Sequence, residues 1–199
     1  GFGIELKFVK MGDSVTLNSG LTEIKEDGQI QWRFENTLIA EINKQTGSMT
    51  VYDDVLDGRF RDRLKLDNQT GSLTITNIRI EHTGRYELQS KTVEKTFRLI
   101  VCDEIPMKEG DSVTLNSDLN QIMANDWIIW MFTNNLIAQI NKWLGFIVYD
   151  DVLDGRFRDR LKLDNQTGSL TITNTTTEHA GVYYLHFNHM SKLVFLAVY

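Results

Sequence analysis

Acidic and histidine side chains come nearest, in type and spacing, to a metal-binding or reactive site in this sequence. Three aspartates of one segment recur in a second segment: Asp53, Asp54 and Asp57, then Asp150, Asp151 and Asp154. Such oxygen ligands suit calcium, but a dedicated calcium loop has a fixed ligand spacing that neither segment shows. We therefore interpret both segments as solvated turns.

Three histidines, His179, His186 and His189, are the candidates for a zinc site. Zinc sites of this kind usually include cysteines, which are scarce here, and we expect these histidines to lie on opposite faces. The sequence contains no nucleophile paired with a base, no phosphate-binding loop and no paired carboxylates that stand out. We therefore expect no enzymatic activity, no catalytic residue, no metal and no cofactor.

The composition indicates a folded, acidic chain of 199 residues, of which 41% are apolar. Its 21 basic and 27 acidic residues give a net charge of -6, which argues against nucleic acid as a partner. Its single cysteine, Cys102, excludes an internal disulfide. The longest apolar runs, Trp127–Phe132 and Leu193–Val198, are too short to cross a bilayer. The opening residues lack the pattern of a signal peptide. We expect membrane attachment only through a segment outside this chain.

The chain is a tandem duplication. Val51–Asn77 recurs without a change at Val148–Asn174, 97 positions later, and Gly12–Ser19 recurs at Gly110–Ser117, 98 positions later. One residue is therefore missing from the second copy, near 45–50. A period of this length matches a whole small domain rather than a solenoid repeat. We predict two domains, residues 1–101 and 102–199.

Within each copy, short alternating segments are separated by Gly, Asn and Asp, a pattern typical of β-strands. The clearest segments of the first copy are Ser14–Leu17, Gln31–Glu35, Ser72–Ile75 and Thr96–Leu99. No window sustains a helical stripe. We therefore predict an all-β protein of two tandem antiparallel β-sandwiches.

Several segments resemble the strands of an immunoglobulin domain. In the first copy these are Val15–Ser19 (strand B), Trp32 (strand C), Leu73–Ile75 (strand E) and His82–Leu88 (strand F, with Tyr86 at the tyrosine corner). The second copy repeats the set with Ser117, Trp130, Leu170–Ile172 and His179–Leu185. The segments 36–54 and 134–151 leave room for strands C′ and C″, which are typical of variable-type domains.

The departures from the immunoglobulin pattern narrow the resemblance. The two bridging cysteines are replaced by Ser19 and Leu88 in the first domain and by Ser117 and Leu185 in the second. A bridge-free variable-type domain with DRLKL and GSLTI segments resembles the membrane-distal domain of the signalling lymphocytic activation molecule (SLAM) family. Members of that family are leukocyte surface receptors that bind themselves or one another through the sheet of strands G, F, C and C′.

The resemblance implies the extracellular part of a cell-surface immune or adhesion receptor. Its partner would be a protein, either a second copy or another immunoglobulin-superfamily receptor. A secreted binding protein or decoy without a membrane anchor remains an alternative, and a hydrolase would need a concave polar site that such sandwiches seldom offer.

The predicted partner-binding face of the first domain consists of residues that alternate with the core positions. These are Gln31, Arg33, Glu35, Glu41, Arg85, Glu87, Gln89 and Arg98. Mixed charge suits a specific protein contact, and the alternative is a solvated sheet face.

The same register makes the second domain apolar on this face. Its predicted binding residues are Ile129, Met131, Trp143, Phe146, Val182, Tyr184 and His186. A contiguous apolar patch usually marks an interface. We expect this face to be buried against a second copy of the chain; burial against the first domain and simple exposure are the alternatives.

Three asparagines occupy glycosylation sequons: Asn68, Asn165 and Asn174. Two of them fall in the duplicated turn between strands D and E, away from the predicted binding face. They favour an extracellular location.

Overall fold

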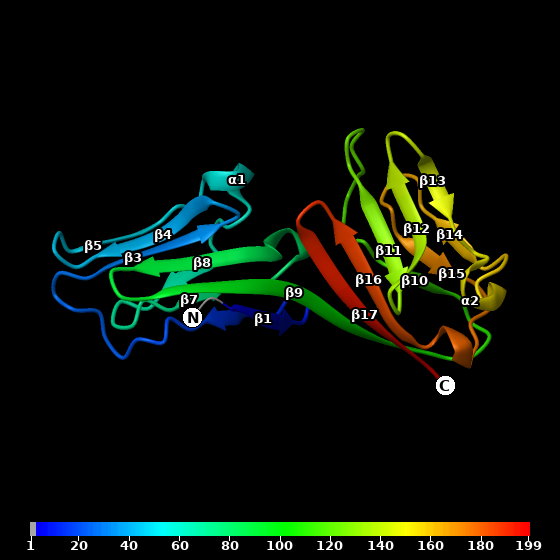
Figure 1. Ribbon diagram of the computed structural model, residues 1–199, viewed down its shortest axis with the longest axis horizontal. Coiled ribbons are helices and arrows are strands. Elements are labelled where there is room, and N and C mark those ends of the chain that lie inside the picture. Colours follow the sequence, from blue (N-terminus) through cyan, green and yellow to red (C-terminus); the bar gives the residue numbers. More distant parts are fainter. Residues whose placement is uncertain (1–2) are drawn as a thin grey trace. The chain divides into compact units, whose positions relative to one another are not determined.

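The computed structural model describes residues 3–199 and divides the chain into two compact units, Gly1–Val101 and Cys102–Tyr199 (Figure 1). Each unit is built from a large sheet and a small sheet. The strand β9 (Glu94–Met107) contributes its first part to unit 1 and its last part to unit 2.

In unit 1 both sheets follow the order expected for a variable-type immunoglobulin sandwich. The large sheet runs β1 (Ile4–Val9), β9, β8 (Gly84–Ser90), β3 (Gln29–Phe34), β4 (Thr37–Asn43), β5 (Ser48–Val51). The small sheet runs β2 (Val15–Leu17), β7 (Leu73–Ile75), β6 (Leu64–Leu66). The pair of β1 and β9 is parallel, whereas the other pairs of this unit are antiparallel. The connections include the short helical segments α1 (Val55–Gly58) and η1 (Ile80–His82).

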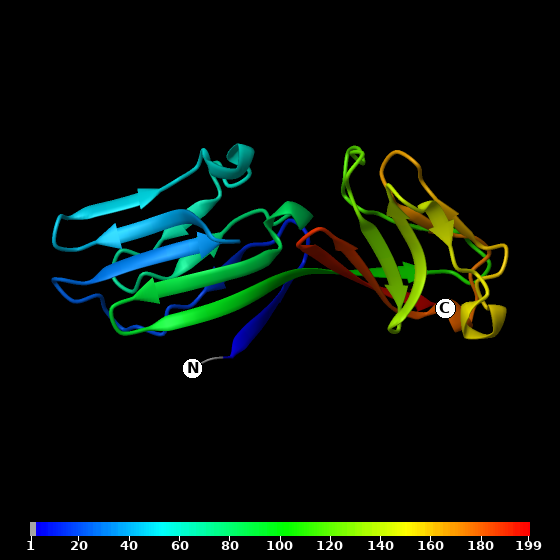
Figure 2. The same cartoon turned by 45° about the horizontal axis from the view of Figure 1, so that its top comes forward.

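Unit 2 repeats this arrangement (Figure 2). Its large sheet runs β9, β17 (Met190–Val198), β16 (Gly181–Phe187), β11 (Ile128–Phe132), β12 (Asn135–Asn141), β13 (Gly145–Val148). Its small sheet runs β10 (Val113–Leu115), β15 (Leu170–Ile172), β14 (Leu161–Leu163), and its helical segments are α2 (Val152–Gly155) and η2 (Thr177–His179). The missing residue lies in the turn before β13: residues 44–47 link β4 to β5, but only residues 142–144 link β12 to β13.

The core of unit 1 lies between its two sheets and follows the alternation of each strand. Successive inward positions of β3, Ile30, Trp32 and Phe34, have no exposed surface, and Leu73 and Ile75 of the small sheet are equally buried. Because side chains alternate across a strand, the residues between them must face outward. The register of β3 therefore decides which residues reach the outer surface.

Two hydrogen bonds hold each core in the expected immunoglobulin pattern. The indole N–H of Trp32 donates to the Gly71 carbonyl at 2.8 Å, and the hydroxyl of Tyr86 donates to the His82 carbonyl at 2.5 Å as the tyrosine corner. Unit 2 repeats both bonds, from Trp130 to Gly168 at 2.8 Å and from Tyr183 to His179 at 2.6 Å. The prediction of two tandem immunoglobulin-like, variable-type sandwiches is confirmed.

Ser19 and Leu88 occupy the positions where immunoglobulin domains usually have the two bridging cysteines. Ser19 is fully buried, and its hydroxyl donates to the Thr70 carbonyl at 2.7 Å, so its polar atom is satisfied on its own side of the sandwich. Leu88, on the facing sheet, is 1% exposed and adds apolar packing. Packing around Trp32 therefore joins the sheets where a disulfide would otherwise do so.

His82 takes the place of the aspartate in the tyrosine-corner motif. Its Nδ1 accepts a hydrogen bond from the Arg79 backbone N–H at 2.9 Å, and its Nε2 lies 2.8 Å from the Arg59 carbonyl. This pairing fits a neutral ring that carries its proton on Nε2. Burial of the ring lowers its pKa below the usual value, because the charged form would be desolvated.

Gly71 tests how tightly the core of unit 1 is packed next to the carbonyl that Trp32 binds. Its φ is +79°, and a Cβ there would lie 2.1 Å from Cδ1 of the buried Ile30. We expect Gly71→Ala to lower the free energy of unfolding of unit 1 by about 2–4 kcal/mol, from left-handed backbone strain and overpacking together. Hydrogen exchange of the β3 and β7 amides in the full chain measures this.

Gly47→Ala is the matched control. Gly47 has a φ of +73°, but a Cβ added there would meet no atom within 4 Å. Only the backbone strain of about 1 kcal/mol applies there. Equal losses in the two variants would contradict the close packing of Gly71 against Ile30.

His82 predicts a pH dependence of unit 1. The folded pKa lies below that of the unfolded chain, so the unfolded chain binds the proton more tightly. Stability is therefore full above about pH 6.5 and falls as the pH drops below it. We expect His82→Gln to flatten this fall below about pH 6.5 in thermal unfolding of unit 1. Identical slopes for the variant and the wild type would show that His82 keeps an ordinary pKa.

Candidate protein-binding faces

The outward positions of the large sheet of unit 1 form a continuous polar surface, here called face 1. Strand pairing places Gln31 opposite Gln89, Arg33 opposite Glu87, and Arg85 opposite Arg98. Face 1 comprises the following twelve residues: Gln29, Gln31, Arg33, Glu41, Thr50, Tyr52, Arg85, Glu87, Gln89, Glu94, Thr96 and Arg98.

Face 1 carries both signs of charge in equal number, three arginines and three glutamates. Arg85 and Arg98 stand directly opposite each other, which alone would be unfavourable. The Nε of Arg85 lies 3.0 Å from Oε1 of Glu87, and this ion pair offsets the repulsion. Arg33 donates to the side-chain oxygen of Gln31 at 3.3 Å. Face 1 is therefore a charge-balanced, hydrogen-bonded surface.

Tyr52 belongs to face 1, although nothing in its sequence context marks it. Its hydroxyl donates to Oε1 of Glu41 at 2.5 Å. This hydrogen bond is the main reason why the pKa of the phenol lies above its ordinary value, and burial and the carboxylate charge add to it. In unit 2 the same two positions are Gln139 and Tyr149, and the amide of Gln139 contacts the Tyr149 hydroxyl.

The structure corrects the placement of Glu35. The predicted strand includes it, but β3 ends at Phe34, and Glu35 lies in the following turn with a φ of 44°. Its Oε1 accepts a hydrogen bond from the backbone N–H of Arg85 at 2.7 Å. The Glu35 carboxylate therefore binds the backbone of β8 and does not extend the outward row of β3.

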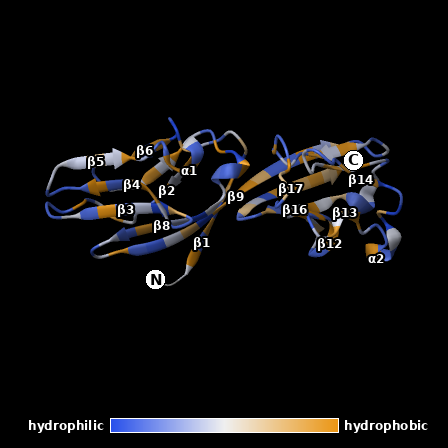
Figure 3. Cartoon of the chain, turned by 90° about the horizontal axis from the view of Figure 1, so that it is seen from above, coloured by the Kyte–Doolittle hydropathy of each residue, from blue (hydrophilic) through white to orange (hydrophobic). Residues whose placement is uncertain are grey.

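The outward positions of the large sheet of unit 2 form face 2, in the same register. Ile129 lies opposite His186 and Met131 opposite Tyr184. Face 2 comprises ten outward strand positions and two residues that directly adjoin β11 and β13, Trp127 and Tyr149; the ten are Ile129, Met131, Gln139, Ile147, Val182, Tyr184, His186, Ser191, Leu193 and Phe195. None of the twelve is Asp, Glu, Lys or Arg. In Figure 3, β16 and β17 of unit 2 carry more of the hydrophobic colour than β8 and β3 of unit 1.

The polar groups of face 2 bond to one another. The hydroxyl of Tyr184 lies 2.8 Å from Oγ of Ser191, and the rings of Tyr184 and His186 stack with centroids 6.1 Å apart. These polar atoms already have partners within the face. The surface offered to an incoming molecule is therefore mainly carbon.

Trp143 and Trp127 form the rim of face 2. Their rings meet edge to face with centroids 6.4 Å apart, and Nζ of Lys142 lies 4.7 Å from the Trp143 ring. Trp143 lies in the turn between β12 and β13 and is 74% exposed. The predicted set of binding residues lacks Trp127, Leu193 and Phe195. The alternation of β11, extended by one step, points to Trp127. An alignment of β17 with the corresponding part of β9 points to Leu193 and Phe195.

The structure also corrects the placement of Phe146. It lies opposite Ile140, whose side chain belongs to the core, so Phe146 points to the inner side of the sheet. It is 49% exposed because β13 is the edge strand. Ile147, its neighbour, is the residue of β13 that faces outward with Gln139.

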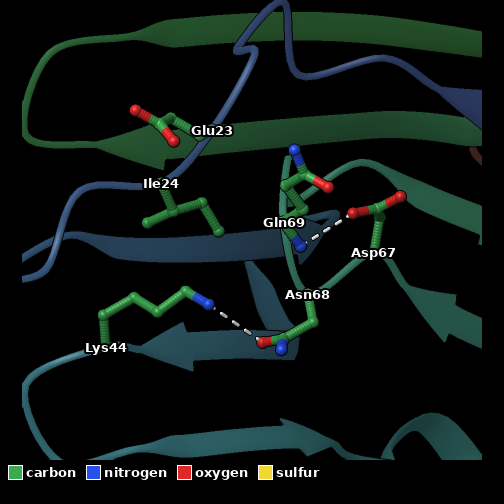
Figure 4. Close-up of a pocket in the computed structure, with 6 residues that line it drawn as sticks. All are labelled: Glu23, Ile24, Lys44, Asp67, Asn68 and Gln69. Carbon is green, nitrogen blue, oxygen red and sulfur yellow. Dashed lines mark hydrogen bonds between the residues drawn. The ribbon is translucent and has the colours of Figure 1, made fainter.

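The three sequon asparagines are exposed and lie outside both faces. Figure 4 shows Asn68 at a shallow polar depression, where its side-chain oxygen accepts a hydrogen bond from Lys44 at 3.2 Å. Backbone hydrogen bonds from Thr70 and Gln69 hold the turn and lower the pKa of Asp67. The depression is open and shows no pairing of a nucleophile with a base.

One aspartate of each duplicated set takes part in an ion pair at the surface. Arg61 contacts Asp54 at 2.8 Å, and Arg158 contacts Asp151 at 3.2 Å. Across residues 3–199 no three side chains of His, Cys, Asp or Glu are grouped so as to hold a metal ion. Over the same range no helix has the length and apolarity to cross a membrane.

Comparison with known proteins finds similarity to solved structures only. No family model and no curated protein matches the chain. Among solved structures, the first Ig-like domain of human CD48 antigen is 26% identical, with a TM-score of 0.41, and the match covers 51% of this chain and 84% of that chain. The CD2-binding domain of CD58 is 12% identical, with a TM-score of 0.44, over 96% and 94% of the two chains. The structure of CD84, a SLAM-family protein, is 19% identical, with a TM-score of 0.41, over 50% and 97%.

The Tyr52–Glu41 contact gives a test of the geometry of face 1. We expect Glu41→Gln to lower the pKa of Tyr52 toward its ordinary value, because the carboxylate that favours the protonated phenol is removed. An NMR titration of the tyrosine ring carbons measures it. Glu87→Gln, which removes a carboxylate that pairs with Arg85 instead, should leave the pKa of Tyr52 unchanged. An unaltered pKa in Glu41→Gln would show that the contact does not form.

Proposed function

We propose that the chain is the extracellular, protein-binding part of a cell-surface adhesion or immune receptor. It binds a protein partner, a second copy or another immunoglobulin-superfamily receptor, through face 1 and face 2. The resemblance of its sequence and fold to SLAM-family domains supports this class of function.

The outward residues of the two large sheets differ far more than the inward ones, and this difference supports the proposal. Each of the twelve residues of face 1 corresponds to one residue of face 2, 97 or 98 positions later in the chain. The residue type differs at eleven of these positions and is the same only for Tyr52 and Tyr149. The inward positions beside them are nearly unchanged, for example Trp32 and Trp130 or Leu88 and Leu185. Folding requirements are the same in both units, so the divergence fits two surfaces with different contacts.

The chemistry of face 1 suits a transient and specific partner. Charge complementarity contributes to the rate of association and to the choice of partner more than to raw affinity. Arg33 and Arg98 offer guanidinium groups to carboxylates of a partner, and Glu41 and Glu94 offer carboxylates to its basic groups. The exposed sequon asparagine of the same unit, Asn68, lies outside face 1, so a glycan there would leave the residues of face 1 uncovered.

A secreted binding protein without a membrane anchor would use the same faces. Detecting the full-length product on intact cells rather than in the medium supports the receptor. Finding it only in the medium supports the secreted alternative.

Charge reversal tests the binding role. Labelled tetramers of the chain are applied to cells that each display one leukocyte immunoglobulin-superfamily receptor or the chain itself. We expect Arg33→Glu with Arg98→Glu to weaken binding by at least about tenfold, and added salt to weaken wild-type binding.

The control carries the same change of charge away from face 1. Lys10→Glu with Lys65→Glu alters two exposed lysines that lie outside face 1 and should leave binding intact. Binding to none of these cells, or equal losses in both double variants, would contradict the proposal.

A further inference from the structure

We infer that a pocket at one end of unit 1 binds a small molecule that carries an uncharged aromatic ring system. The pocket lies between the segment that links β2 to β3 and the turn that links β8 to β9, and it shares only Gln29 with face 1. The inference goes beyond the proposed function, because it needs no protein partner.

The pocket is mainly apolar and has a volume of about 230 Å³. Leu21 and Ile24, which are half-buried against the core, form its floor together with the fully buried Ile30. Gly28 belongs to the wall, where a Cβ would lie only 2.5 Å from Cγ2 of Ile24. An apolar cavity of about 150 Å³ holds benzene, whereas sites for drug-sized ligands measure about 300 Å³ or more. The volume therefore suits a single small ring system.

Unit 2 fills the equivalent place with a ring of its own. Strand pairing puts Ser90 opposite Ile30 in unit 1 and Phe187 opposite Ile128 in unit 2. Phe187 is 7% exposed, so its phenyl ring is buried at this position. Ser90 is much smaller, and its hydroxyl accepts a hydrogen bond from the backbone N–H of Val93 at 2.9 Å. Unit 1 thus leaves room for a ring that another molecule supplies.

The floor of the pocket is the same in both units, but its rim is not. Of the eleven lining residues, only Leu21, Ile24 and Ile30 keep their type at the matched positions of unit 2. The other eight all differ, and Gln29, for example, corresponds to Trp127. The apolar floor is therefore common to both sandwiches, whereas the small and polar rim residues belong to unit 1.

The rim carries both signs of charge in equal number. Its lysines are Lys25 and Lys91, and its carboxylates are Glu23 and Asp27. Nζ of Lys91 lies 3.6 Å from Oδ2 of Asp27, and this ion pair joins the two sides of the pocket. A charged ligand would meet a like charge beside each opposite one and would lose hydration over the apolar floor. An uncharged ring system with one hydrogen-bonding group, such as indole, avoids both costs.

The experiment is a titration of the full chain with indole, followed through the backbone amide signals by NMR. We expect saturable shifts at Gly28 and Thr92, with a dissociation constant of about 0.1–1 mM for a ligand of about nine non-hydrogen atoms. The amides of Asp126 and His189, at the matched positions of unit 2, should not shift. Phenylacetate, which adds a negative charge to a ring, should bind at least about threefold more weakly than indole.

Three variants locate the site. Ser90→Phe fills the pocket with the residue that unit 2 carries there and should weaken indole binding at least about tenfold. Ile24→Asn places an amide on the floor and should weaken binding several-fold through lost apolar contact. Ser14→Phe adds the same ring as Ser90→Phe at an exposed position outside the pocket and should leave the dissociation constant unchanged. Near-ultraviolet circular dichroism confirms the fold of each.

The inference is overturned if indole causes no saturable shift at Gly28 and Thr92, or if Ser90→Phe and Ser14→Phe bind indole equally well. It is also overturned if the largest shifts fall in unit 2. Loss of cell binding in Ser90→Phe, with no indole binding by the wild type, would assign the pocket to a side chain of a protein partner and reject a small molecule. Indole binding by a chain that binds no cell rejects only the proposed receptor function.

Discussion

The hydrogen bond from the Trp32 indole to the Gly71 carbonyl, with its copy from Trp130 to Gly168, is the contact on which the structure depends. A disulfide between positions 19 and 88 would contribute roughly 4 kcal/mol, and burying Leu88 at one of these positions returns about 2 kcal/mol. The tryptophan contributes the largest buried side chain of each core and a polar link between the two sheets. It also fixes the inward register of its strand, and so determines which residues face outward.

Because the inner side of each large sheet is constrained, the outer side is where the two units have diverged. The same backbone positions carry Arg33 and Glu87 in unit 1 but Met131 and Tyr184 in unit 2, in both cases as direct neighbours across two strands. The duplication thus acts as an internal control, in which fold and core are held nearly constant. It separates a charge-balanced surface from a carbon-rich one within a single chain, and the two surfaces suit partners of different chemistry.

The sequence was sufficient to predict the fold and the outward direction of residues next to a buried tryptophan or tyrosine, since alternation extends from such anchors. It was insufficient where the strand lacks an anchor. Phe146 follows a shortened turn and lies on an edge strand, so periodicity alone does not reveal its side. Glu35 belongs to a tight turn with positive φ, which ends the alternation. Lys192 is buried between Asp103 at 3.1 Å and Asp118 at 2.6 Å, and such pairing of distant segments leaves no local pattern.

Hydroxyl-radical footprinting of the intact chain at rising concentration reports on individual side chains and so shows whether face 2 binds a second copy. We expect oxidation of Met131 and Trp127 to fall as the concentration rises. Oxidation of Met49 and Met123, which are exposed outside face 2, should stay constant. Unchanged oxidation of Met131, or an equal fall at all four residues, would show that face 2 does not bind a second copy.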